Sequence, residues 1–357
     1  MIIFLTTAAH GYTIRRFLEC SQSGLRRRVI TMSYGEFLSW PTLPAGHYIF
    51  ADVDRLDAAE AAAVATRIDH LAQALPQASR LNDPRRLLGR LKLLNALHAS
   101  GSNAFDARLA SDSIDGLRYP VFVRPLVEHT AGTTSRLRTP EELEQALQAL
   151  SASGQSLDRY IVTEYVDVRN AQGHHEVYSL LRVGSHFIAT CYATHVDWIV
   201  KGEAHEATLG DIAAANLDFV RSNPHAHLLK PVFATAGIDY GRVDYAFSAA
   251  RLQVFEINSN PFTLATPEYL PDYREAGRHF EAALSAALAA IDAPLAGVGR
   301  WLAVAGSRGP ACIEAPGPVR RALRRMLKRL DRLEWEHACG AVLSKLKALR
   351  GKPPTHA

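Results

Sequence analysis

The chain has 357 residues, of which 48% are hydrophobic and 21% charged, and its formal net charge is +4. This length predicts two or three lobes, and this composition excludes a disordered or fibrous protein. The sequence has four scattered cysteines, and it has no apolar run long enough to span a membrane, no signal peptide and no C-x-x-C metal motif, so we expect a cytoplasmic protein with reduced thiols.

The first elements predict an alternating α/β lobe. Strand and helix patterns alternate at 2–6, 13–21, 28–32 and 48–53. Asp57 then caps an Ala-rich helix over 58–75, whose apolar residues recur at helical spacing. The lobe ends at LNDP, so its predicted boundary is residue 82.

The next segment predicts a second, smaller lobe. Pro84 opens a helix with leucines at helical spacing and Lys92, and the strand PVFVRP follows at 120–125. A loop of small residues, EHTAGTTS, leads to the helix TPEELEQALQAL, which has Thr139 as its N-cap and Pro140 in its first turn.

A third group of elements predicts a sheet of paired strands. The strand patterns are YIVTEYV at 160–166, EVYSLLRV at 176–183 and HFIATCYA at 186–193. A tight turn at Gly184 and Ser185 joins the last two strands. A helix over 270–291 closes this group, and a Gly/Pro-rich linker leads to a basic helical tail.

The stretch GRVDYAFSAARLQVFEINSNP, residues 241–261, combines an apolar strand pattern with several polar side chains. If Ala250 lies at the centre of the turn, Asp244 falls opposite Glu256 and Arg242 opposite Asn258. The other face then carries Val243, Tyr245, Phe247, Phe255 and Ile257.

Two opposed carboxylates destabilise a strand pair unless something neutralises them. Asp244, Glu256 and the amide oxygen of Asn258 form a hard oxygen set, which suits Mg²⁺ or Mn²⁺ better than zinc. Because Mg²⁺ shares its coordination shell with water and phosphates, the set predicts a nucleotide nearby. The alternative interpretation is a hairpin face that is merely solvated.

These motifs, in this order, resemble the ATP-grasp superfamily, especially the D-alanine–D-alanine ligases and the ribosomal-protein glutamate ligases. The resemblance covers about residues 80–290, and its most specific motif is GRVDYAF…LQVFEINSNP. It implies an α/β ATP-grasp fold in which two lobes enclose ATP. The implied domains are an N-terminal α/β domain at 1–82, a small lobe at 83–158, a large lobe with the metal hairpin at 159–293, and a linker with the basic tail at 294–357.

Carried over residue by residue, the resemblance makes Asp244, Glu256 and Asn258 the ligands of two Mg²⁺ or Mn²⁺ ions that bridge the ATP phosphates. Arg242 would stabilise a developing oxyanion, although a simple ion pair with Asp244 is the other interpretation. Arg124 stands where the family has a lysine. It keeps the positive charge but changes the geometry of the phosphate contact, so the sequence leaves open whether catalysis is retained.

The resemblance also implies a set of ATP contacts. Lys92, Arg124 and Lys201 would meet phosphates, and Glu176 would meet the ribose. Glu164, Tyr165 and Val166 would read the adenine edge. Each of these residues has an ordinary structural alternative, such as a solvated helix lysine or a plain strand.

The function that the resemblance implies is an ATP-dependent ligase that joins a carboxylate to an amine through an acylphosphate, on an amino acid or peptide. Two alternatives stay open, a nucleotide-binding module that has lost catalysis and a phosphotransferase that stops after phosphorylation. We also expect a homodimer as one assembly state.

The C-terminal tail carries the excess of basic over acidic residues. From Pro318 onward the chain has eleven Lys or Arg residues and three Asp or Glu residues. Its apolar stripe predicts a helix that docks on the body of the protein. The other interpretation is contact with an acidic partner or an anionic membrane surface.

Overall fold

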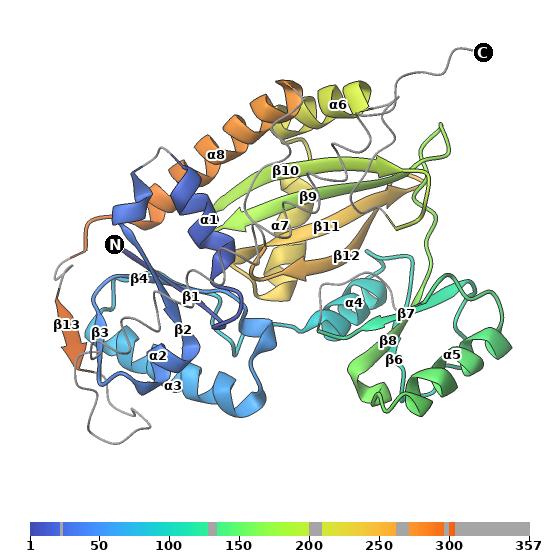
Figure 1. Cartoon of the computed structure of the whole chain (residues 1–357), viewed down its shortest axis with the longest axis horizontal. Coiled ribbons are helices and arrows are strands. Elements are labelled where there is room, and N and C mark those ends of the chain that lie inside the picture. Colours follow the sequence, from blue (N-terminus) through green and yellow to red (C-terminus); the bar gives the residue numbers. More distant parts are fainter. Residues whose placement is uncertain (22–23, 128–133, 200–208, 262–270, 296–299, 304–357) are drawn as a thin grey trace, which may run out of the picture. The chain divides into compact units, whose positions relative to one another are not determined.

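The computed structural model describes residues 1–303, apart from 22–23, 128–133, 200–208, 262–270 and 296–299. The described residues lie in one compact unit, Met1–Ser307. Over these residues the chain is a mixed α/β structure with four sheets (Figure 1), which confirms the expected class. The division of this unit into three domains remains a prediction.

A parallel four-stranded sheet in the order β2-β1-β4-β5 forms the first part of the chain. Its elements are β1 (Ile2–Thr6), α1 (Tyr12–Cys20), η1 (Leu25–Arg27), β2 (Val29–Ser33), α2 (Tyr34–Ser39), β4 (His47–Phe50), η2 (Val53–Arg55), α3 (Ala58–Ala74) and β5 (Arg80–Leu81). Asp57 caps α3 as predicted, in a reciprocal capping box with Glu60. A short pair, β3 (Thr42–Pro44) and β13 (Trp301–Ala303), lies beside this sheet.

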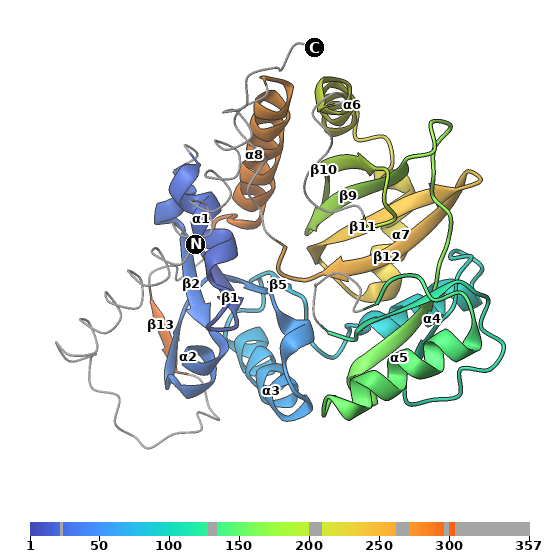
Figure 2. The same ribbon diagram turned by 45° about the vertical axis from the view of Figure 1, so that its right-hand side comes forward.

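Alternate residues of β1 enter different apolar clusters. Ile2 and Phe4 pack with α1 and with α8 (Pro271–Ile291), whereas Ile3 and Leu5 pack with α2 and α3. The chain runs from β1 to β2 on one side, where the two strands lie next to each other in Figure 2, and returns to β4 on the other. The carboxyl ends of β1 and β4 are therefore a topological switch point, where α/β proteins commonly bind ligands.

A small antiparallel sheet in the order β6-β8-β7 comes next. Its elements are α4 (Arg90–Ala99), β6 (Ala107–Leu109), β7 (Val121–Pro125), α5 (Pro140–Ala152), η3 (Leu157–Arg159) and β8 (Tyr160–Glu164). The Thr139 cap of α5 is confirmed, since its hydroxyl accepts from the backbone N–H of Glu142. The helix predicted from Pro84 begins only at Arg90, because the backbone N–H of Leu88 instead donates to the carbonyl of Ala236 at 3.0 Å.

The largest antiparallel sheet has the order β10-β9-β11-β12. Its elements are β9 (His175–Val183), β10 (His186–His195), α6 (Leu209–Ser222), α7 (Ala226–Ala236), β11 (Tyr240–Ser248), β12 (Arg251–Asn258) and α8. Helices α6 and α8 lie along β10, and α7 packs on the other face of the sheet (Figure 1). The predicted turn between β9 and β10 is confirmed, because Val183 pairs with His186.

Asn82 fastens the parallel sheet to the largest sheet. Its side chain is fully buried, and its φ of +66° is a left-handed conformation that Asn tolerates better than most residues. Its amide nitrogen donates to the carbonyls of Phe50 at 3.2 Å and Tyr240 at 2.7 Å. Its Oδ1 accepts from the backbone N–H groups of Asp239 at 2.7 Å and Tyr240 at 2.9 Å. Four hydrogen bonds thus join the end of β4 to the start of β11.

We expect Asn82→Ala to lower the free energy of unfolding by about 2–3 kcal/mol, because it leaves buried backbone groups without partners. Urea unfolding followed by circular dichroism measures this loss. Asn95→Ala is the matched control, since Asn95 is exposed on α4 and should change stability by less than about 0.5 kcal/mol. Equal losses in the two variants would contradict the structural role of Asn82.

Candidate active site

Strands β11 and β12 bring together the polar set of the predicted hairpin. Asp244 lies opposite Glu256, and Arg242 lies opposite Asn258. The opposition expected from the sequence is therefore confirmed. Two carboxylates, a guanidinium and a carboxamide occupy two rungs near one end of the ladder, on either side of the Val243–Ile257 pair.

The register depends on a β-bulge, which the sequence analysis does not predict. Ala249 and Ala250 have φ values of +47° and +65° and form a two-residue turn. Counting back from such a turn would place Asp244 opposite Phe255. The ladder instead shifts by one residue beside Asp244, so Phe255 is an extra residue in a β-bulge and Glu256 takes its place.

The bulge also moves Phe255 off the face predicted for it. Its ring stacks on Phe105 with 6.1 Å between the ring centroids, in the cluster that contains Leu94 and Ile161. Val243 belongs to a different cluster. The prediction that Phe255 and Val243 share one face is wrong, because the extra residue reverses the alternation of side chains along β12.

Asp244 is held by two side chains. Arg242 donates from Nε to Oδ1 at 2.9 Å and from Nη2 to Oδ2 at 3.0 Å, and the hydroxyl of Ser179 donates to Oδ1 at 2.7 Å. The charge of Asp244 raises the pKa of Arg242. Burial raises the pKa of the nearby Cys191 thiol to about 11, so this thiol is protonated at neutral pH.

Glu256 is shared by two arginines, one from α4 and one from β7. Arg90 donates to its Oε2 at 2.9 Å, and Arg124 forms a close ion pair with the same oxygen. The three side chains are only 7%, 12% and 13% exposed for Arg90, Arg124 and Glu256, so water screens their charges weakly. Arg90 also donates to the carbonyls of Pro125 and Leu126, at 2.8 Å and 3.2 Å. Burial and the neighbouring Arg124 lower the pKa of Arg90 to about 10, at which it is still a cation at neutral pH.

Arg90 is a site residue that the sequence analysis misses, while Lys92 on the same helix is exposed. Side chains two positions apart on an α-helix point in directions about 200° apart, so Lys92 cannot face the hairpin alongside Arg90. The signal was present, because Arg90 precedes the buried Leu93, Leu94 and Leu97 by three, four and seven positions. An arginine on the apolar stripe of a helix indicates a buried partner.

The end of β12 continues the site toward the parallel sheet. The Oδ1 of Asn258 accepts from the backbone N–H of Asn260 at 2.8 Å. The hydroxyl of Ser259 donates to Asp54 of η2 in a close contact. The chain after Asn258 is therefore bonded to the loop that follows β4.

Glu164 is almost fully buried, and its carboxylate already has several partners. It accepts from the backbone N–H groups of Arg118 at 2.6 Å and Asp106 at 3.0 Å. The guanidinium of Arg118 donates to its Oε2 at 2.6 Å and 3.1 Å. The predicted adenine contact would have to share these oxygens.

Tyr165, Val166 and Glu176 lie around the connection from β8 to β9. The hydroxyl of Tyr165 lies 2.8 Å from Nε2 of His175, and the guanidinium of Arg136 lies 4.8 Å from the centre of its ring. Val166 packs against the cluster of Phe105 and Phe255.

Glu176 accepts hydrogen bonds from three side chains. The hydroxyls of Tyr192 and Tyr178 donate to it at 2.8 Å and 3.3 Å, and Asn170 donates at 3.1 Å. Its predicted ribose contact, like the other nucleotide contacts, remains a prediction.

Several expected features lie outside the described residues. They are Lys201, most of the EHTAGTTS loop and the tail from residue 304 onward. Within the part of the chain that the structure describes, no helix is long and apolar enough to cross a membrane.

The donors at the hairpin fit a hard divalent cation in their chemistry. Asp244 and Glu256 supply carboxylate oxygens and Asn258 an amide oxygen, the ligand types that Mg²⁺ takes in proteins. Across the described ranges, no group of three or more His, Cys, Asp and Glu residues could hold a metal ion. Such an ion would therefore need the amide and further ligands from substrate or water.

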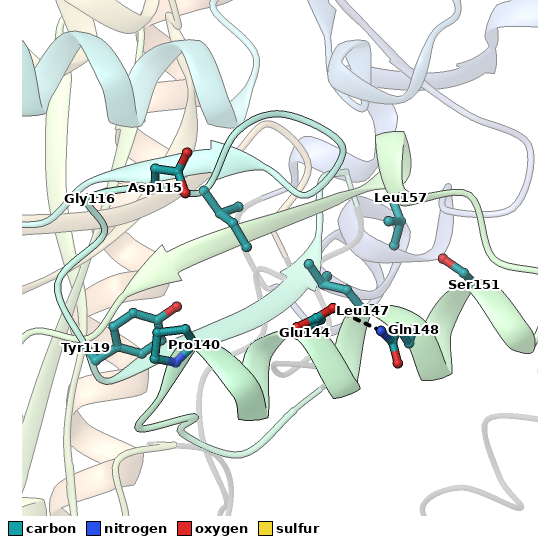
Figure 3. Close-up of a pocket in the computed structure, with 10 residues that line it drawn as sticks. Asp115, Gly116, Tyr119, Pro140, Glu144, Leu147, Gln148, Ser151 and Leu157 are labelled. Carbon is teal, nitrogen blue, oxygen red and sulfur yellow. Dashed lines mark hydrogen bonds between the residues drawn. The ribbon is translucent and has the colours of Figure 1, made fainter.

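A separate pocket of about 570 Å³ lies beside α5 (Figure 3). Its lining includes Tyr119, Pro140, Glu144, Leu147, Gln148 and Leu157. None of the predicted site residues lines it. The pocket therefore gives no support to the nucleotide contacts and is distinct from the hairpin.

Comparisons with known proteins identify a similar fold. No family model matches the chain, and no curated protein matches it. Solved structures similar to it include the D-alanine–D-alanine ligase of Bacillus anthracis complexed with ATP, at 11% identity over 81% of this chain and 97% of that chain, with a TM-score of 0.43. The RimK domain ATP-grasp protein of Sphaerobacter thermophilus has 13% identity over 80% and 98%, with a TM-score of 0.47. The D-alanine–D-alanine ligase of Coxiella burnetii has 13% identity over 82% and 94%, with a TM-score of 0.46. At identities of 11–13%, these similarities concern the fold alone.

Proposed function

We propose that this protein is an ATP- and Mg²⁺-dependent ligase that joins a carboxylate to an amine through an acylphosphate, with an amino acid or peptide as substrate. The observation that carries the proposal is the hairpin, where Asp244 faces Glu256 and Arg242 faces Asn258. The motif resemblance supports the same assignment.

The charges around the hairpin support binding of a polyphosphate. Arg90, Arg124 and Arg242 supply three positive charges, and Asp244 and Glu256 supply two negative ones, all in ion pairs with one another. Arginine is well suited to phosphate because its planar fork offers several fixed donors. An entering triphosphate would compete with Glu256 for Arg90 and Arg124 and so free the carboxylate for other ligands.

The chemistry divides into two transfers. The substrate carboxylate attacks the γ-phosphorus of ATP and ADP leaves, which forms an acylphosphate; an amine then attacks the acyl carbon and phosphate leaves, which forms an amide. Arg90 and Arg124 would hold the phosphate oxygens, and Arg242 would donate to the oxyanion of the second step. Asp244, Glu256 and Asn258 would hold Mg²⁺, which neutralises phosphate charge when bound.

The first test is nucleotide binding by the Asp244→Asn variant. In the wild type, Mg-ATP at 100 times its Kd should stabilise the fold by about 2.7 kcal/mol, seen as a rise in Tm. We expect Asp244→Asn to lose most of that rise, because it removes a charged metal ligand while keeping the shape of the side chain. Differential scanning fluorimetry with Mg-ATP, and with ATP plus chelator, measures the effect.

The control for this test is Asp218→Asn, at an exposed position of α6. It should keep the full Mg-ATP shift. A shift of wild-type size in Asp244→Asn would remove the support for a metal site at the hairpin.

A second test addresses catalysis. Hydroxylamine traps an acylphosphate as a hydroxamate, so the wild type should form hydroxamates from at least one acid in a panel of amino acids and dipeptides with Mg-ATP. Mg-ATP binding without any hydroxamate would favour the nucleotide-binding module, for which Arg124 in place of lysine is the motivating observation.

A further inference from the structure

A histidine lies at the switch point of the parallel sheet and has no part in the proposed phosphate chemistry. His10 follows β1, and Asp52 follows β4, so both lie at the carboxyl ends of the two strands between which the topology reverses. Ligands of open α/β sheets bind in this place. The side chain of His10 is 32% exposed, whereas that of Asp52 is only 3% exposed.

Thr7 connects the two side chains. Its hydroxyl donates to Oδ2 of Asp52 at 2.8 Å and lies 2.7 Å from Nδ1 of His10. The backbone N–H of Thr7 donates to the same Asp52 oxygen at 3.0 Å, and Arg55 forms an ion pair with the other oxygen at 3.3 Å. Asp52 thus accepts two hydrogen bonds from Thr7 and is paired with Arg55.

These contacts determine the tautomer of His10. A threonine hydroxyl has one proton, and this proton goes to the Asp52 carboxylate, which can only accept. The hydroxyl oxygen must then accept from Nδ1–H of His10. In the neutral imidazole, Nε2 is therefore unprotonated and can accept a proton. Of the residues that the structure describes, none hydrogen-bonds to this Nε2.

The loop that carries His10 is bonded to the end of the hairpin. The side chain of Asn260 donates to the carbonyl of His10 at 3.3 Å and accepts from the hydroxyl of Thr13 at 2.7 Å. The backbone N–H of Asn260 donates to Asn258. One residue thus joins the histidine loop to the proposed metal ligand, which places the switch point beside the hairpin end.

We propose that His10 is a catalytic residue that binds the amine substrate through Nε2 and takes the proton that the amine loses. The inference rests on the proposed function. As the nitrogen lone pair forms the C–N bond, the C–O bond to phosphate breaks, phosphate leaves with its electron pair, and one N–H proton passes to Nε2. Thr7 and Asp52 are positioning residues that keep Nε2 free of a proton and stabilise the imidazolium that results.

The experiment compares two nucleophiles in the wild type and in His10→Gln, with Mg-ATP and the amino acid and dipeptide panel. Hydroxylamine attacks without a protein base because it is uncharged at neutral pH. We expect His10→Gln to keep hydroxamate formation within about twofold and to lose amide formation with amino acids by about 10² or more. Added imidazole should restore part of the amide-forming rate. His186→Gln, at an exposed histidine of β10, is the matched control and should keep both rates.

Each outcome decides between the two proposals. Hydroxamate from no acid, in the wild type, would overturn the proposed function and this inference with it. Hydroxamate together with unchanged amide formation in His10→Gln would overturn the inference alone. Loss of both products in a folded His10→Gln would also overturn it, because the role would then not be confined to the amine.

A ligand-free measurement checks the positioning residues. The ¹⁵N spectrum of histidine-labelled protein should show His10 as the Nδ1–H tautomer, assigned by its absence in His10→Gln. Thr7→Val should change that tautomer, whereas Thr7→Ser should keep it. A proton on Nε2 in the neutral wild-type ring would overturn the inference.

Discussion

Glu256→Gln should lower the free energy of unfolding by about 3–5 kcal/mol, more than the other substitutions considered above. The variant keeps the size of the side chain but leaves the guanidiniums of Arg90 and Arg124 buried side by side without their shared carboxylate. Their mutual repulsion, which together with the larger effect of burial already lowers the pKa of Arg90, would then go uncompensated. Urea unfolding in the absence of nucleotide measures the loss.

Two further variants make this test specific. Glu19→Gln, at an exposed position of α1, should change stability by less than about 0.5 kcal/mol. Combining Glu256→Gln with Arg90→Leu should recover part of the lost stability, because it removes one uncompensated charge and leaves an apolar residue on the stripe of α4. A double variant no more stable than Glu256→Gln alone would argue against the repulsion.

Arg242→Lys should lower kcat for hydroxamate formation by about 10²–10³, the usual effect of removing one donor to an oxyanion. Lysine keeps the positive charge beside Asp244 but cannot reproduce the two-pronged contact at 2.9 Å and 3.0 Å. The charge balance of the site is unchanged, so the variant isolates the geometry of the donors. ADP release and hydroxamate yield measure the effect.

Binding provides the control for Arg242→Lys. The rise in Tm with Mg-ATP should stay within about a quarter of the wild-type value, since the fork is expected to act in the transition state rather than on the bound nucleotide. Equal losses of binding and turnover would instead assign Arg242 to holding Asp244 or the phosphates.

The opposed pairs of the hairpin could be predicted from the sequence, whereas the two-residue turn and the β-bulge that produce them could not. Alternation along two strands and an estimate of the turn place Asp244 near Glu256. Whether a turn has two or three residues, and whether a bulge compensates, depends on packing such as that of Phe255 on Phe105, which joins segments far apart in the chain.

The helices show a similar division. Thr139 and Asp57 cap helices as predicted, because capping is local chemistry. Helix α7 is absent from the prediction, and it contains Pro231, which ordinarily ends a helix. Arg90 is missed for a related reason, since its partner Glu256 lies 166 positions further along the chain.

The extra residue in β12 makes the pairing of the two acids independent of the length of the turn that joins their strands. Because the ladder shifts by one beside Asp244, the pairing of the carboxylates no longer follows from the parity of the turn at Ala249 and Ala250. A related chain could therefore lengthen this loop by one residue, drop the residue equivalent to Phe255, and present the same acids to the same ligand. Because one residue is gained and one is lost between the two acids, their spacing along the chain would stay the same although the turn differs.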